Sequence, residues 1–207
     1  MRFRACLLLV LGVTGFAQGP VNPDFRKATW GMTKAQVLAA EWNPPNDVRE
    51  SNGEVVVRYD SMKLAGLNGT VAYIFVKNKL VRAKYLLDAQ HDNLNDCIAD
   101  YHAVEPLLRS VHGEPAGQRA VWEDDSLQEE RVGYLDQDRA LPENIFPSDN
   151  FVGAAVSLGH LKLYTEWSDR RTKILHALTG ADGRITHQIE YRSVEFGALE
   201  AEVRNAN

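Results

Sequence analysis

Short runs of β-forming residues, separated by turn-forming residues, follow one another along most of the chain after residue 45. Turn dipeptides such as Asn52-Gly53 and Asp182-Gly183 precede or join these runs, and an Asp-Gly pair between two runs is a strong hairpin signal. Asn68-Gly69-Thr70 matches a glycosylation sequon, but we interpret its Asn-Gly pair as a turn. The pattern predicts antiparallel strands over residues 54–59, 71–76, 80–87, 120–123, 159–167, 173–179 and 184–193.

A helix is predicted to begin just after Trp30-Gly31-Met32. Thr33 is a suitable N-cap residue, and Gln36 stands three positions later, which completes the pattern of a capping box. Asn43-Pro44-Pro45 ends the helix, because proline lacks the amide proton and disfavours a helical residue before it. These local signals predict one helix of about nine residues.

A second helix is predicted in the middle of the chain. Five residues that share one helical face recur at steps of four, three, four and three: Cys97, Tyr101, Val104, Leu108 and Val111. Pro106 lies inside this pattern, so we expect a kink or a new helix start there. Gly113-Glu114-Pro115 ends the helix.

The order of helix, proline stop, strands and final hairpin occurs twice, which predicts an internal duplication. The predicted fold is α+β, with two tandem helix-on-antiparallel-sheet units at residues 18–95 and 96–207. The second unit carries an insertion at residues 124–150 that is rich in acidic and poor in apolar residues, and we interpret it as a long acidic loop. The four tryptophans are assigned to the core.

The N-terminus has the features of a secretory signal at residues 1–17. Met1-Arg2-Phe3-Arg4 is basic, residues 5–13 are apolar, and Gly15-Phe16-Ala17 provides the small residues that a signal peptidase reads. We therefore predict an exported protein, periplasmic or extracellular, with no integral membrane segment in the mature chain. The formal net charge of -5 becomes more negative once the signal is removed, which argues against a nucleic-acid partner.

Cys97 is the only cysteine that remains after cleavage at this site, so no disulfide can form within one mature chain. Its place on the apolar stripe of the second helix predicts a small buried side chain. The alternatives are an intermolecular disulfide and a reactive thiol.

One passage resembles the nucleophile elbow of a serine hydrolase. Ala155-Val156-Ser157-Leu158-Gly159 has the serine in place, and Asp169 or Asp182 followed by His187 would complete a triad in hydrolase order. However, the elbow must lie between a strand and a helix, whereas residues 161–167 alternate as a strand. We therefore predict that Ser157 is not a nucleophile.

His176 and His187 are predicted to lie on one face of a hairpin. If Asp182-Gly183 is a two-residue loop, His176 faces Ile189 and His187 faces Leu178, so the two rings are diagonal neighbours. A metal site would need a third ligand, and the spacing indicates none, so we expect two hydrogen-bonded histidines on a half-buried face.

No catalytic residue, metal ligand or cofactor is assigned from the sequence, and no binding residues are identified. Asp136-Gln137-Asp138 in the acidic insertion suggests calcium, but Arg139 and Ala140 follow and there is no glycine at the turn, so the calcium-loop pattern fails.

Residues 31–38, Gly-Met-Thr-Lys-Ala-Gln-Val-Leu, resemble the helix start of the β-lactamase inhibitor protein family and of the related small outer-membrane assembly lipoproteins. That resemblance implies helices packed on an antiparallel sheet, and in the inhibitors two such units in tandem. The stapling disulfides of the inhibitors and the lipobox of the lipoproteins are absent here. Residues 80–85, 157–161, 165–174 and 189–191 are similar to passages in exported bacterial proteins of unknown function, a resemblance that implies a shared fold and no activity.

We expect a non-enzymatic binding module for a protein or peptide in the bacterial envelope, because an open sheet face and a long acidic loop can both recognise a partner. The alternative is a metal-dependent or hydrolytic enzyme that uses His160, His176 or His187. A third possibility is a structural component of the envelope.

Overall fold

The computed structural model describes residues 22–124 and 152–205. The predicted signal peptide and almost all of the predicted acidic insertion lie outside these residues. The strands are β1 (Asp47–Ser51), β2 (Glu54–Leu64), β3 (Leu67–Val76), β4 (Lys79–Leu87), β5 (Gly117–Trp122), β6 (Leu161–Ser168), β7 (Thr172–Ala181) and β8 (Arg184–Ser193). The helices are α1 (Lys34–Ala40), α2 (Asp96–His112), α4 (Val152–Leu158) and α5 (Gly197–Asn205).

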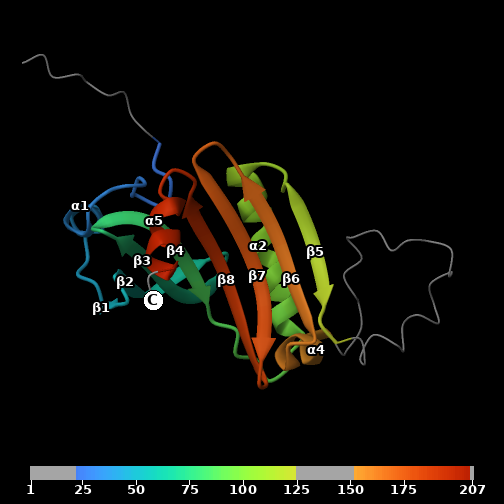
Figure 1. The fold of residues 1–207 in the computed structure, drawn as a ribbon. Coiled ribbons are helices and arrows are strands. Elements are labelled where there is room, and N and C mark those ends of the chain that lie inside the picture. Colours follow the sequence, from blue (N-terminus) through green and yellow to red (C-terminus); the bar gives the residue numbers. More distant parts are fainter. Residues whose placement is uncertain (1–21, 125–151, 206–207) are drawn as a thin grey trace, which may run out of the picture.

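All eight strands belong to one antiparallel sheet, in the order β1-β2-β3-β4-β8-β7-β6-β5. The mixture of helices with an antiparallel sheet confirms the α+β class. The first four strands are consecutive neighbours, and β8 pairs with β4, so the sheet runs without a break through both halves of the chain (Figure 1). The division into two tandem units stays a prediction.

Helices lie on both faces of the sheet. Alternate residues of β3 point to opposite sides, and Tyr73 and Phe75 pack in a core that includes Val37 of α1 and Val104 of α2. A neighbouring core holds α4 against β6 and β7 on this same side, which we call the inner face. On the opposite, outer face, α5 packs over β3 and β4 (Figure 1). Leu199 and Val203 of α5 pack against the buried cluster that contains Ile74. Among residues 22–124 and 152–205, no helix covers the outer face of β5 to β8.

The first helix forms where it is predicted. The hydroxyl of Thr33 accepts a hydrogen bond from the Gln36 amide, and the Gln36 side chain accepts one from the Thr33 amide, so the capping box is confirmed. The helix ends at Ala40 and is thus two residues shorter than expected. Val37 is fully buried.

The second helix departs from its prediction in two respects. It continues through Pro106 as one helix, because the proline lies on the exposed side, where water can hydrate the carbonyl that loses its donor. Four residues of the predicted stripe are buried, but Val111 in the last turn is 65% exposed.

Two further expectations are wrong. The β2–β3 turn lies at Ala65-Gly66, and Gly69 is a strand residue of β3. A Cβ at Gly69 would lie closer than 3.0 Å to the Leu86 carbonyl oxygen, so the glycine serves close strand packing. Trp42, assigned to the core, is 87% exposed, because it follows the end of α1 in the connection to β1, and the Lys27 ammonium lies over its ring.

Candidate functional site

A row of three cationic residues crosses the outer face of the sheet. Arg82 on β4 lies directly opposite Arg192 on β8, and Arg192 lies directly opposite Lys173 on β7. Opposed side chains in such pairs have Cβ atoms about 5 Å apart, and like charges at that separation repel. The fold must therefore supply carboxylates around this row.

Glu190 is the central carboxylate. It is only 3% exposed, and it accepts hydrogen bonds from Lys84 and from the Nε of Arg192. Arg82 is 3.7 Å away. Burial by itself raises the pKa of Glu190, but the hydrogen bond and charge of Lys84, with those of Arg192, outweigh burial and hold the pKa below its ordinary value. The side chain is therefore a carboxylate at neutral pH.

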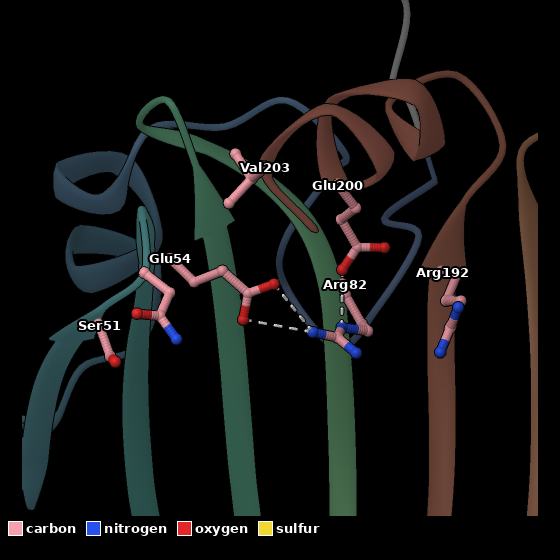
Figure 2. Close-up of a pocket in the computed structure, with 7 residues that line it drawn as sticks. Ser51, Glu54, Arg82, Arg192, Glu200 and Val203 are labelled. Atoms are coloured by element: carbon pink, nitrogen blue, oxygen red, sulfur yellow. Dashed lines mark hydrogen bonds and ion pairs between the residues drawn. The ribbon is translucent and has the colours of Figure 1, made fainter. Parts of the chain in front are cut away.

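Arg82 links three elements on the outer face. Its guanidinium lies 3.3 Å from Glu54 of β2 and 2.8 Å from Glu200 of α5. Figure 2 shows these two carboxylates on either side of Arg82, with Arg192 on the neighbouring strand and turned away from both. Arg82 thus links α5 to the sheet. Arg192 uses its Nε to bond Glu190, and its terminal guanidinium nitrogens can donate to other groups.

Two hollows adjoin at Arg192. The first, of about 370 Å³, lies between α5, the β1–β2 turn and the row of cations, and its lining includes Glu54, Arg82 and Arg192 (Figure 2). The second, of about 550 Å³, continues from Arg192 across β7 and β6 to Ala116 just before β5. We call the two together the outer trough. Its lining mixes charged side chains with the apolar side chains of Ala116 and Leu175.

On the inner face, the predicted register of the β7–β8 hairpin is confirmed. His176 is opposite Ile189 and His187 is opposite Leu178, and the Nε2 atoms of the two histidines are 2.8 Å apart. Both rings are fully buried rather than half-buried, and Tyr101 of α2 stacks on His176 at 4.0 Å between ring centroids. Burial lowers the pKa of His187 to about 4 and that of His176 well below 6.5. A substrate has no access to this pair.

His160, the third histidine of the enzyme alternative, lies away from this pair. His160 is in the short connection between α4 and β6, and its Nε2 is 3.8 Å from the carboxylate of Asp124. No group of three or more metal-ligating side chains is brought together within the described ranges. The described residues therefore hold no assembled metal centre around His160, His176 or His187.

Ser157 is at the end of α4, and a strand follows it. This is the reverse of the strand-then-helix order that a nucleophile elbow requires. The serine hydroxyl donates to the carbonyl of Ala154, and Asp169 accepts hydrogen bonds from backbone amides in the β6–β7 turn. Asp182 lies in the β7–β8 turn. These residues have structural contacts and form no triad.

Cys97 is fully buried in α2, and its thiol donates to the Ala89 carbonyl oxygen. Burial raises the pKa of the thiol, so its place in the structure matches the prediction of a small buried side chain. Asp136-Gln137-Asp138 lies outside the described residues.

The residues of the outer trough were missed from the sequence. Arg82 and Lys84 on one strand, and Glu190 and Arg192 on another, are each two residues apart and so share a face. That spacing was the available signal. It gives no indication that the two strands are neighbours.

No protein-family model, curated protein or solved structure matches this chain. Among the helices of the described residues, none has both the length and the apolar character needed to cross a bilayer.

Proposed function

We propose that this chain is an exported, non-enzymatic binding protein of the bacterial envelope, and that the outer trough takes an extended segment of a protein or peptide partner. The observation that carries this proposal is that two hollows share Arg192 in their linings, and these linings together extend from the β1–β2 turn to Ala116 just before β5. A groove that crosses several strands suits a linear ligand.

The dimensions of the trough agree with a peptide. Its lining runs from Glu54 on β2 to Ala116 before β5, which is six strand-to-strand steps in the sheet order. At about 4.8 Å per step the trough is roughly 29 Å long, and an extended chain that rises about 3.3 Å per residue fills it with about nine residues.

The chemistry of the lining also favours a peptide. Apolar side chains such as Leu175 alternate with charged ones such as Lys173 and Glu166. A peptide offers both kinds of group at short, regular intervals, and its backbone can bond to the exposed polar side chains. The buried histidines of the inner face offer no comparable access, so a binding function accounts for the described residues better than an enzyme does.

A random 12-residue peptide library displayed on phage tests this proposal. The wild-type protein is compared with Ala116→Trp, which fills the second hollow, and with Ala39→Trp, which adds the same side chain on the exposed side of α1. We expect enriched peptides that bind the wild type and Ala39→Trp equally and bind Ala116→Trp at least tenfold more weakly. Circular dichroism verifies that both variants are folded.

Two results would contradict the proposal. One is the absence of enrichment above a blank surface. The other is a set of enriched peptides whose affinity is the same for Ala116→Trp as for the wild type, since these peptides would bind elsewhere on the molecule.

A further inference from the structure

The cations of the outer trough are unevenly supplied with carboxylates. Arg82 has Glu54 and Glu200 within ion-pair distance, in addition to Glu190 at 3.7 Å. Lys84 and Arg192, by contrast, both pair with Glu190. One negative charge shared between these two positive charges leaves the β8 side of the row with excess positive charge.

Lys173 increases this excess. Its side chain is exposed, it lines the second hollow, and it lies directly opposite Arg192. Among the described residues, no carboxylate lies within 4.0 Å of its ammonium group. Glu166 lines the same hollow, but it is paired with Arg119 of β5. The Arg192–Lys173 end of the row is thus the place where an added negative charge is most stabilised.

The geometry of Arg192 suits a carboxylate. Its Nε donates to Glu190, which holds the guanidinium plane in place, and the two terminal nitrogens remain as a pair of parallel donors. The side chain is 47% exposed, so these donors are accessible to a ligand. Lys173 adds a third, more flexible donor on the next strand.

Apolar surface lies beside these donors. Leu175 is the next residue on the outer face of β7 after Lys173, and Ala116 closes the far side of the hollow. An acidic side chain flanked by apolar ones would match both surfaces, because its neighbours in an extended segment would reach Leu175 and Ala116 while the carboxylate meets the cations.

We propose that Arg192 and Lys173 together bind an aspartate or glutamate side chain of the peptide in the outer trough, so that the partner is an acidic, partly apolar segment. This inference rests on the proposed function and adds the chemical class of the ligand. Lys173 is the cation of this site that has no paired carboxylate, and the surface around it is partly exposed. Binding is therefore modest in strength and weakens as the salt concentration rises.

An array of 12-residue peptides in matched pairs tests the inference. In each pair, one member contains Asp or Glu, and the other has Asn or Gln at the same positions. The wild-type protein is compared with Lys173→Glu and with Lys63→Glu, which makes the same charge change on an exposed residue near the far end of β2. Hexanoate, a carboxylate on a short apolar chain, is the competitor that represents a non-peptide source.

The expected result is that acidic members bind the wild type roughly tenfold more tightly than their amide partners. Lys173→Glu removes this preference and Lys63→Glu retains it, and raising NaCl from about 50 to 500 mM weakens the acidic members more than the amides. Hexanoate displaces the acidic peptides from the wild-type protein only at a large molar excess over the peptide.

The outcomes that overturn the inference are distinct from one another. Peptides that lose binding to Ala116→Trp but do not discriminate acid from amide would retain the proposed function and exclude a carboxylate ligand. Displacement by hexanoate at the peptide's own concentration would identify a free alkanoate as the ligand in place of a peptide. An array in which no peptide binds the wild type overturns both the inference and the proposed function.

Discussion

The Nε2 atom of His176 meets the Nε2 atom of His187 at 2.8 Å inside the core. In the neutral pair, one ring donates from Nε2 and the other accepts, so the two histidines hold different tautomers. The Nδ1 atoms of both rings are buried, and neither has a hydrogen-bond partner among the described residues. A proton added to this pair would place a charge in the core, where no carboxylate of the described ranges forms an ion pair with either ring and the charge of Asp100 offsets burial only in part.

The pair makes the protein sensitive to mild acid. The pKa of His187 falls from 6.5 to about 4 on folding, so the unfolded chain binds more protons between these values. We expect the contribution of this pair to the free energy of unfolding to be fully present above about pH 6.5. That contribution decreases as pH falls toward 4, by roughly 3 kcal/mol for His187 alone. Urea unfolding at pH 7.0, 6.0 and 5.0 measures this slope, in a range above the titration of ordinary carboxylates.

The matched variant is His176→Phe with His187→Phe, which removes both titrating rings. His112, whose pKa is also lowered by burial, remains in this variant. It accounts for the pH dependence of the free energy of unfolding that the variant retains. We expect the double variant to lose most of the pH dependence between 7.0 and 5.0. An unchanged slope would show that the pair is not the source.

Glu190→Gln tests the balance of charge in the outer trough. The substitution keeps the shape of the side chain but leaves Arg82, Lys84 and Arg192 without their shared negative charge. Removal of one charge from a buried ion pair leaves the partner charges without a counter-charge. We therefore expect a loss of about 3 kcal/mol in the free energy of unfolding, measured by urea denaturation. Glu166→Gln breaks the exposed pair with Arg119 and should cost less than about 1 kcal/mol. Equal effects of the two variants would contradict the central role of Glu190.

Gly69→Ala tests the close approach of β3 and β4. Its new methyl group would meet the Leu86 carbonyl oxygen, and relief of that clash requires the two strands to separate, at a cost of about 2 kcal/mol or more. Gly117→Ala in the edge strand β5 is the control, because a Cβ there meets nothing within 4 Å. The control should be neutral or slightly stabilising, since alanine restricts the unfolded chain. Thermal unfolding of both variants distinguishes these outcomes.

The Cys97 thiol should be unreactive while the protein is folded. It is buried and its pKa is raised, so a thiol reagent such as Ellman's reagent reaches it only when the chain unfolds. With Cys6→Ser removing the second thiol, we expect a reaction rate that rises with urea in parallel with unfolding. Reaction of the folded protein at the rate of a free thiol would place Cys97 at an accessible surface instead.

The local features of this fold are the ones that sequence patterns predict well. The capping box at Thr33 depends on residues three positions apart, and the contact of His176 with His187 follows from the two-residue turn between them. In both cases the geometry is fixed by a short stretch of chain.

The outer trough could not be predicted in the same way. Arg82 and Arg192 face each other because β4 pairs with β8, and about a hundred residues separate these strands along the chain, with no turn to set their register. The helices α4 and α5 were also missed. The seven residues of α4 have no polar face, since burial by neighbouring elements replaces the amphipathic pattern, and α5 is only nine residues long.

The pairing of β4 with β8 also sets the order in which the molecule can be completed. A chain that emerges N-terminus first presents β1 to β4 well before β8 and α5, and during that interval β4 is an open edge whose amides and carbonyls invite pairing with other chains. Glu190 and Glu200 arrive with the last strand and helix, so the edge closes and the charges around Arg82 are neutralised together. The outer trough is therefore complete only after the C-terminal strand and helix have folded.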